Sequence, residues 1–233
     1  MKKIISLFII VATLSSFSYL VNDCGGLIFF KEGTSTVMTS YNEDGKVTGS
    51  AKTIYTGVTK SPAGAMVKAQ QENFDKKGKS TSKSEFTITC DHGNLIFDMK
   101  MMMPQEQADS YKDMEMTMEG NNKELPSDFV VGSSLKDATI KFKFKTKEGV
   151  EMSMMNMSFK ISNRKVEAKE TITTPAGTFE CYKLTEDIEM KTMFAMKMKS
   201  ATWFNAQSGT IRTETYRENG KFAGKSELTE IKG

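Results

Sequence analysis

The stretch Thr139–Lys145, which reads TIKFKFK, decides the fold class, because apolar and basic side chains alternate along it without a break. Residues two apart share one face of a β-strand. Ile140, Phe142 and Phe144 therefore lie on one face, and three lysines lie on the other. The pattern predicts a strand of an antiparallel sheet that has one buried and one solvated face.

Similar runs, joined by short polar turns, extend through most of the chain. The expected strands are 34–41, 47–59, 65–74, 81–90, 94–98, 139–145, 152–161, 165–173, 178–188, 192–204, 209–216 and 222–231. One short helix is expected near Pro104–Lys112, because proline is tolerated at the start of a helix. A sheet of more than about ten strands must curl or split. We therefore predict a mostly β chain with a strongly curved antiparallel sheet, a half-open barrel, and we keep a closed barrel or sandwich as the alternative.

Three segments repeat one pattern, an aromatic residue and polar residues followed by Gly-Lys. They are Tyr41–Lys46 (YNEDGK), Phe74–Lys79 (FDKKGK) and Tyr216–Lys221 (YRENGK). Glycine readily adopts the positive φ that hairpin turns require. Since no helix follows to offer its N-terminus to a phosphate, we interpret the repeats as β-hairpins and not as phosphate-binding loops.

The N-terminus has the three parts of a secretory signal peptide. Lys2 and Lys3 precede an apolar run of 11 residues, Ile4–Leu14, and small residues stand before a cut after Ser18. The run is too short for a comfortable membrane span. We therefore expect residues 1–18 to be removed. Residues 19–233 would form a single β half-barrel domain in the periplasm or at the outer cell surface, with no transmembrane segment.

Composition excludes several classes of function. Without Lys2 and Lys3, Lys+Arg falls from 32 to 30 against 29 Asp+Glu, so the mature chain has no general field for nucleic acid. The single histidine, His92, lies in the expected turn Asp91-His92-Gly93 and cannot form a multi-histidine metal site. No G-x-S-x-G, P-loop, H-E-x-x-H or C-x-x-C motif occurs. We predict no catalytic residues, no metal and no cofactor.

Three cysteines remain: Cys24, Cys90 and Cys181. An oxidising compartment permits one disulfide and one free thiol, with three possible pairings. Cys24–Cys90 is the preferred pair, because it would tie the mature N-terminus to the body of the domain. Three buried thiols are the alternative.

Methionine is unusually abundant, with 18 residues, and 15 of them lie in four clusters. Met114, Met116 and Met118 alternate with acidic and polar residues, and Phe194, Met196 and Met198 alternate with lysines. They can fill an ordinary core, line an adaptable apolar cavity, or hold Cu(I), the weakest of the three interpretations. The candidate ligand-binding face comprises Met114, Met116, Met118, Ile140, Phe142, Phe144, Phe194, Met196 and Met198.

A resemblance to a known group rests on the segments Asn163–Ala168, Thr173–Lys183 (TTPAGTFECYK) and Glu214–Tyr216, and on Asp23-Cys24. These residues resemble the TapB-like group of exported Bacteroidota-type proteins, which is distantly similar to lipoprotein carriers of the LolA type. The resemblance implies a curved sheet with a short helical lid and an apolar concave face. It implies no catalytic residues.

The sequence therefore predicts an exported, non-enzymatic protein that binds or carries an apolar ligand, such as a lipid or a lipoprotein acyl chain. The alternative is a structural or interaction module of the cell envelope that has no small-molecule ligand.

The signal peptide yields the first testable prediction. We expect the exported protein to begin near Tyr19 and to carry no acyl group on Cys24, because the charged Asp23 replaces the small residue that lipid modification requires before the cysteine. N-terminal sequencing and intact mass measurement check this. Recovery of a diacylated Cys24 as the first residue would contradict it.

Overall fold

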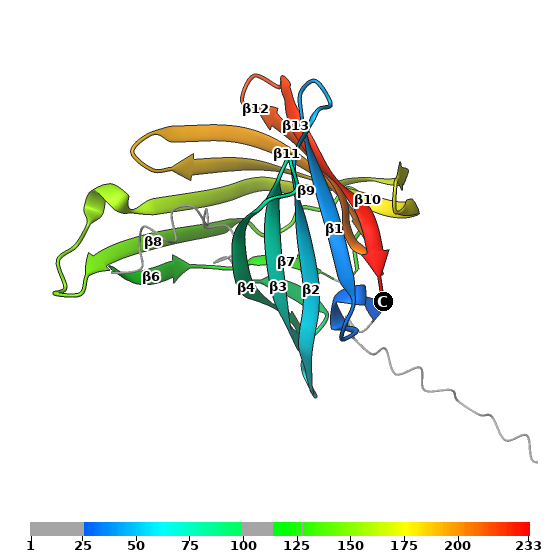
Figure 1. The fold of residues 1–233 in the computed structure, drawn as a ribbon, viewed down its shortest axis with the longest axis horizontal. Coiled ribbons are helices and arrows are strands. Elements are labelled where there is room, and N and C mark those ends of the chain that lie inside the picture. The colour runs from blue at the N-terminus through cyan, green and yellow to red at the C-terminus, as the bar shows by residue number, and fades with distance from the viewer. Residues whose placement is uncertain (1–25, 99–113, 127) are drawn as a thin grey trace, which may run out of the picture.

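The computed structural model describes residues 26–98, 114–126 and 128–233. Its architecture is one continuous sheet of 13 antiparallel strands, strongly curved and not closed into a barrel (Figure 1). The predicted mostly β chain with a curved antiparallel sheet is confirmed. The expected helix near Pro104–Lys112 lies outside the described residues.

The order of the strands in the sheet is β6-β8-β9-β10-β11-β12-β13-β1-β2-β3-β4-β5-β7, so β6 and β7 are the two edges. The strands are β1 (Ser35–Asn42), β2 (Val47–Ser61), β3 (Gly64–Asp75), β4 (Ser80–Asp91), β5 (Asn94–Phe97), β6 (Met114–Gly120), β7 (Lys123–Pro126), β8 (Ala138–Thr146), β9 (Met157–Thr174), β10 (Gly177–Lys191), β11 (Ala195–Asn205), β12 (Gly209–Arg217) and β13 (Phe222–Lys232). Two short 3₁₀ helices, η2 (Ile28–Phe30) and η5 (Ser153–Met155), precede β1 and β9.

The three repeated segments form three hairpin turns with the same hydrogen bonds. In the first, the Asn42 amide donates to the Lys46 carbonyl at 3.0 Å, and the Gly45 amide donates to the Asn42 carbonyl at 3.0 Å. The other two turns repeat both bonds, and all three glycines have φ between 75° and 81°. The prediction of hairpins is confirmed, since the backbone at each glycine is left-handed.

Several expected strand limits are wrong. The expected strands 152–161 and 165–173 form one continuous strand, β9, which begins only at Met157, and β6 was not among the expected strands. The expected strand 192–204 begins only at Ala195, because residues 192–194 form the turn between β10 and β11. Residues 123–126, which were not among the expected strands, form the edge strand β7, paired with β5. Short strands of this kind give little periodic signal, so pairing with a neighbour decides whether they form.

The body of the molecule is built around a core between the two arms of the curved sheet. Side chains from β2, β3, β4, β5 and β7 meet Val166 of β9, Leu184 of β10 and Phe204 of β11. Helix η2 adds Phe29, whose ring lies against Gly209 at the start of β12. A Cβ on Gly209 would approach the Phe29 ring to 2.0 Å, and the glycine has φ 76°, so this position requires glycine on both grounds.

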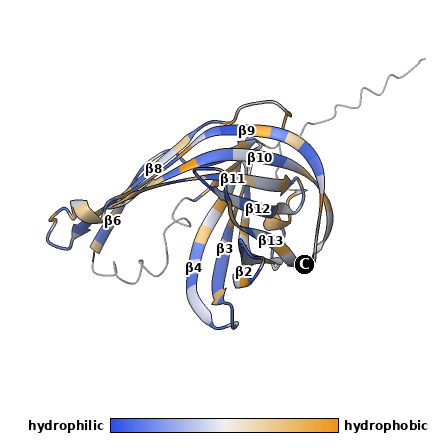
Figure 2. Cartoon of the chain, turned by 90° about the horizontal axis from the view of Figure 1, so that it is seen from above, coloured by the Kyte–Doolittle hydropathy of each residue, from blue (hydrophilic) through white to orange (hydrophobic). Residues whose placement is uncertain are grey.

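Strands β9 and β10, of 18 and 15 residues, continue beyond this body. Together with β6, β8 and β11 they form a projection that we call the wing: residues 114–120, 138–146, 157–162, 187–191 and 195–199. Figure 2 shows the wing extending away from β2, β3 and β4. A separate core cluster, described below, lies on one of its faces.

A buried arginine joins the edge strand β7 to the middle of β9 and β10. The Arg164 side chain is 2% exposed and donates to the carbonyls of Lys136 and Glu124, the latter at 3.0 Å. Its Nε lies 3.4 Å from the carboxylate of Glu186, which also accepts from Lys123 Nζ at 2.6 Å. The guanidinium therefore satisfies backbone groups of β7 and of the β7–β8 connection that have no sheet partner there.

Residues 132–135 of the β7–β8 connection run along the same part of β9, after a turn that the Ser133 amide closes on the Val130 carbonyl. The amides of Gly132 and Leu135 donate to the carbonyls of Val166 and Arg164 at 2.8 and 2.9 Å, and Val166 donates back to Ser133 at 2.9 Å. These bonds bridge the opening between β7 and β9 although the two strands do not pair.

This network yields a stability prediction. Replacing Arg164→Ala should lower the free energy of unfolding by about 3 kcal/mol, because it removes three donors from a buried site and leaves two carbonyls unsatisfied. Arg164→Lys should recover only part of the loss, since an ammonium cannot present the planar fork. Urea denaturation measures both. Lys169→Ala, which breaks the exposed pair with Glu180, is the control and should leave the midpoint unchanged. An Arg164→Ala midpoint equal to that of the control would refute this role.

Candidate functional site

The wing has one apolar and one polar face, and the strand register fixes both. Met116 pairs with Phe144, and Met118 pairs with Phe142, which pairs with Met157. Residues paired directly across antiparallel strands share a face. Further along, the register aligns Ile140, Phe159, Met190 and Met196 in one row, and Ala138, Ile161, Ile188 and Met198 in the next. We call the side that carries these rows and Met114 the apolar face.

The centre of the apolar face is closely packed. Ile140, Phe142 and Phe144 are at most 2% exposed, and they form one cluster with Met157, Phe159 and Ile161. The rings of Phe142 and Phe159 meet edge to face, with centroids 6.1 Å apart. These aromatic and branched side chains form a rigid floor on β8 and β9.

Methionines surround this floor. The partly buried hydrophobic residues that pack against the cluster are Met114, Met116, Met152, Met155, Ile188 and Met190. Thioether side chains have three rotatable bonds and fit many apolar shapes. The face therefore combines a fixed centre with an adaptable border.

The nine predicted site residues fall into three groups. Ile140, Phe142 and Phe144 are in the buried centre, and Met114, Met116 and Met198 are half-buried. Met118 and Met196 are on the same face but are 38% and 51% exposed. Phe194 lies in the β10–β11 turn and is 79% exposed, so it does not continue the row of Met196 and Met198 as the expected strand 192–204 implied.

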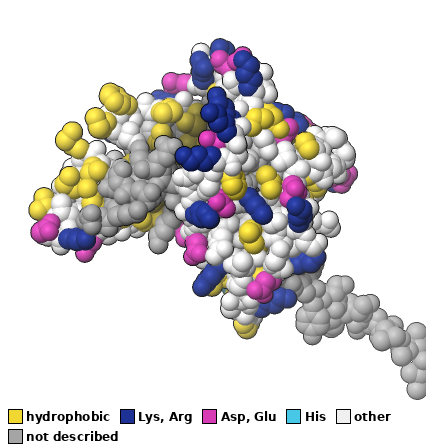
Figure 3. All heavy atoms as spheres, in the orientation of Figure 1, with side chains coloured by type: hydrophobic (Ala, Val, Ile, Leu, Met, Phe, Trp, Pro, Cys, Tyr) yellow, Lys and Arg dark blue, Asp and Glu magenta, His cyan; other side chains and the backbone are white. Residues whose placement is uncertain are grey.

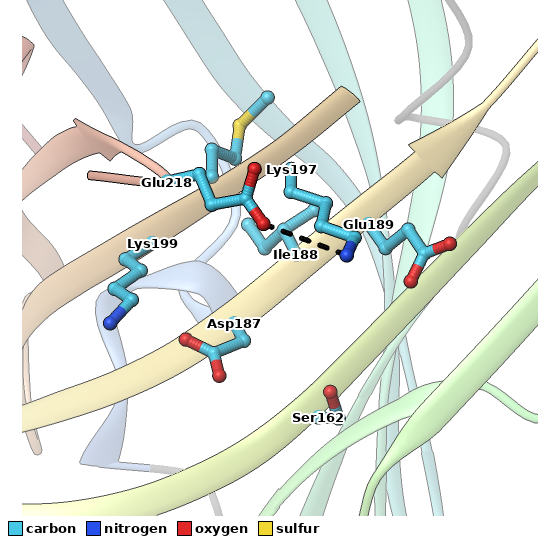
Figure 4. A pocket seen from close by; sticks show the side chains of 8 residues that line it. Ser162, Asp187, Ile188, Glu189, Lys197, Lys199 and Glu218 are labelled. Carbon is cyan, nitrogen blue, oxygen red and sulfur yellow. Dashed lines mark ion pairs between the residues drawn. The ribbon is translucent and has the colours of Figure 1, made fainter. Parts of the chain in front are cut away.

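The opposite, polar face of the wing contains a shallow hollow of about 260 Å³. Figure 4 shows the side chains that line it. Most are polar-face residues of β9, β10 and β11 or belong to the β12–β13 turn, and two apolar-face residues, Ile188 and Met198, complete the lining. Asp187 and Glu189 of β10 pair across the strands with Lys199 and Lys197, and Lys197 Nζ lies 3.5 Å from the Glu218 carboxylate. A second hollow of about 410 Å³ adjoins it and shares Asp187 and Lys199.

Ion pairs compensate part of the charge on the polar face. Across the wing, Lys143 donates to Glu119 at 2.7 Å, and this pair lowers the pKa of Glu119 and raises the pKa of Lys143. Both groups are exposed, so the pair contributes little to stability. The register nevertheless places more cations than anions on this face, namely Lys141, Lys143, Lys145, Lys160, Lys191, Lys197 and Lys199 against Glu115, Glu119, Asp187 and Glu189, so its net charge is positive.

Catalytic constellations are not evident among the described residues. His92 lies in the β4–β5 turn with φ 47°, and its exposed ring contacts the Asp91 carboxylate at 2.7 Å. Within residues 26–98, 114–126 and 128–233, no three His, Cys, Asp or Glu side chains gather as a metal would require. In the same ranges, no helix is long and apolar enough to cross a membrane.

Two residues that matter to the wing were not among the predicted site residues. Met152 precedes η5 and Met155 ends it, and both pack against the apolar cluster.

The turn 146–150 was also missed. It has the same hydrogen bonds as the three repeated turns and a glycine at the same place, Gly149, with φ 84°. Its sequence TKEGV carries the same polar-polar-Gly signal, so the turn at least could have been predicted.

The fold and the wing define a class of open, strongly curved antiparallel β-sheet proteins. The chain belongs to the DUF3108-like family, which matches residues 31–228. This is the family that the comparisons support, whereas the TapB-like name and the LolA relation stay predictions. No curated protein matches the chain.

Solved structures show the same fold. A protein from Bacteroides fragilis, inferred to be exported and described as YmcC-like in fold, is 23% identical and superimposes with a TM-score of 0.70, covering 87% of this chain and 97% of its own. An inferred lipoprotein from Parabacteroides distasonis is 22% identical, with a TM-score of 0.68, covering 86% and 95%. At these identities the likeness establishes the shared architecture.

Cys181 yields a prediction about reactivity. It is a free thiol, fully buried between β9 and β11, and burial raises its pKa to about 11. The neutral thiol is a poor nucleophile. We expect no reaction with a thiol reagent at pH 8 in the native state. After unfolding without reductant, we expect one thiol per chain to react. Absorbance of the released chromophore measures this. Rapid native labelling at Cys181, located by mass spectrometry, would contradict the burial.

Proposed function

We propose that this chain is an exported protein of the cell envelope that binds an apolar ligand, such as an acyl chain, without catalysing a reaction. The binding site is the apolar face of the wing. The observation that carries the proposal is the border of methionines around a rigid aromatic floor, on a part of the sheet that projects from the main core. Sites for small apolar molecules have this composition.

The wing projects from the body with one charged face and one broad apolar face. An apolar face of this extent is not needed for solubility, and leaving it in contact with water costs free energy. Methionines at its border can change rotamer at a small energetic cost, so an acyl chain could be accommodated without moving the backbone. The floor residues Ile140, Phe142 and Phe144 are at most 2% exposed, so an acyl chain would first contact the half-buried methionines of the border and reach the floor as those side chains move.

Export is supported by two independent observations. Residues 1–18 have the pattern of a signal peptide. Of the two structural relatives, one is described as an exported protein and the other as a lipoprotein. An oxidising compartment would also allow the preferred Cys24–Cys90 disulfide and leave Cys181 as the thiol. Cys24 lies outside the described residues, so the pairing stays a prediction.

The second candidate is an envelope interaction module that has no small-molecule ligand. It is favoured by the full burial of Phe142 and Phe144, which indicates that the centre of the face is filled. The hollows described on the polar face are lined mainly by charged and polar residues. In this alternative the methionines are an ordinary core.

The experiment compares two variants on one strand. Met116→Glu places a charge on the apolar face, whereas Thr117→Glu places it on the polar face opposite Lys143. If the face binds apolar ligands, Met116→Glu should weaken the affinity for the uncharged probe N-phenyl-1-naphthylamine about tenfold, equivalent to about 1.4 kcal/mol. Thr117→Glu should bind as the unmutated protein does. Fluorescence titration and thermal melting are measured on the same samples.

The two candidates predict different combinations of these readouts. Ligand binding predicts probe affinity in the unmutated protein and only a moderate fall in melting temperature for Met116→Glu. A filled core predicts no probe binding and a large fall in melting temperature, because the charge is buried without a partner. The second combination would leave the interaction module as the function.

A further inference from the structure

The outer end of the wing exposes large apolar side chains. Met193 and Phe194 in the β10–β11 turn are 68% and 79% exposed, and Val150 and Met154 in the β8–β9 connection are 60% and 78% exposed. The two connections are neighbours, because Lys191 at the end of β10 pairs with Ser158 at the start of β9. Hydrophobic side chains gather at this end of the molecule in Figure 3. We call these four residues the apolar tip.

Such a tip is unusual for a turn in water. Turn residues are commonly Gly, Asn, Asp, Ser or Pro, and a single exposed apolar residue needs no explanation. Here several large apolar residues lie together on two adjacent connections, and Met196 extends the group along β11. Grouped exposure of this kind marks a surface that is covered by a partner.

The charge of the hairpin identifies the partner. Residues Glu189–Lys199 contain three lysines and one glutamate, a net charge of 3 − 1 = +2. Lys191 precedes the apolar turn, and Lys197 and Lys199 follow it on the polar face of β11. The three lysines therefore flank the turn that carries Met193 and Phe194, and Lys197 also lies 3.5 Å from Glu218. Basic residues that flank an apolar tip in this way can meet lipid headgroups while the tip enters the acyl region.

We propose that the apolar tip inserts into the surface of an anionic lipid bilayer, with Phe194 and Met193 among the acyl chains and the hairpin lysines at the phosphates. A second copy of this chain would instead have to place the lysine-rich hairpins close to each other, which like charge opposes. The inference is separate from the proposed ligand site, because the tip residues do not belong to the apolar floor.

Vesicle co-sedimentation of the exported form of the chain tests the proposal. We expect binding to phosphatidylcholine vesicles that contain phosphatidylglycerol and weaker binding to phosphatidylcholine alone. Phe194→Ser should reduce the partition coefficient about tenfold, and Lys191→Ala about fivefold with the remaining binding less sensitive to salt. Val130→Ser is the matched control, because Val130 is 64% exposed but lies in the β7–β8 connection, beside the middle of β9.

A second readout reports insertion directly. Trp203 is the only tryptophan of the chain and is buried, so Phe194→Trp adds one exposed reporter at the tip. Brominated lipids should quench the added fluorescence and leave the fluorescence of the unmutated protein unaffected.

The proposal is overturned if the unmutated protein does not bind anionic vesicles, or if Phe194→Ser binds as the control does. It is also overturned if Phe194→Ser dissociates a dimer while Phe194→Trp is not quenched, which would assign the tip to self-association. Loss of vesicle binding with intact probe binding separates this inference from the proposed ligand site.

Discussion

The contact between Arg164 and the opposite edge of the sheet is the constraint on which the open, curved shape depends. A sheet of 13 strands has two edges, and here β7 ends near the middle of β9 without pairing with it. Arg164 fills that position with one planar group that donates to two backbone carbonyls and faces Glu186. Burial lowers the pKa of the guanidinium and Glu186 opposes that shift, so the pair is held in the low-dielectric interior by its hydrogen bonds.

This closure divides the molecule into a body and a wing. Below Arg164 the two arms of the sheet enclose the main core, and beyond it β9 and β10 continue with only β6, β8 and β11 beside them. Among the described residues, the cluster on the apolar face of the wing contains no side chain from the other arm. The properties that we relate to function, the methionine border and the exposed tip, both arise from that separation.

The alternation of side chains gives the wing its two surfaces. The polar face carries ion pairs, such as Lys143 with Glu119 and Lys197 with Glu218, and an excess of lysine. The apolar face changes from buried aromatic residues at its centre to exposed methionine at Met118 and Met196. A ligand on the apolar face and a bilayer at the tip would therefore both contact apolar side chains, which are buried at the centre of the face and exposed at the tip. The fold alone establishes neither function.

Local patterns in the sequence predicted those parts of the fold that depend on neighbouring residues. The strand at 139–145 and the three Gly-Lys turns are confirmed, because period-two alternation and positive-φ glycine act over a few residues. The methionine-rich alternation also marked the residues that the register brings to one face. The limits of β10 and β11 were missed, since Met193 and Phe194 are apolar residues in a turn.

The sequence by itself determined a two-faced antiparallel sheet, its hairpin turns and the apolar character of one face. Only the tertiary structure decided which apolar residues are buried, because burial depends on which strands lie opposite one another. The sequence predicts alternating strands at both Phe144 and Phe194, yet Phe144 is 1% exposed and Phe194 is 79% exposed. The role of Arg164 is likewise set by the curvature, which brings the carbonyl of Glu124, 40 residues away in the chain, within 3.0 Å of its guanidinium.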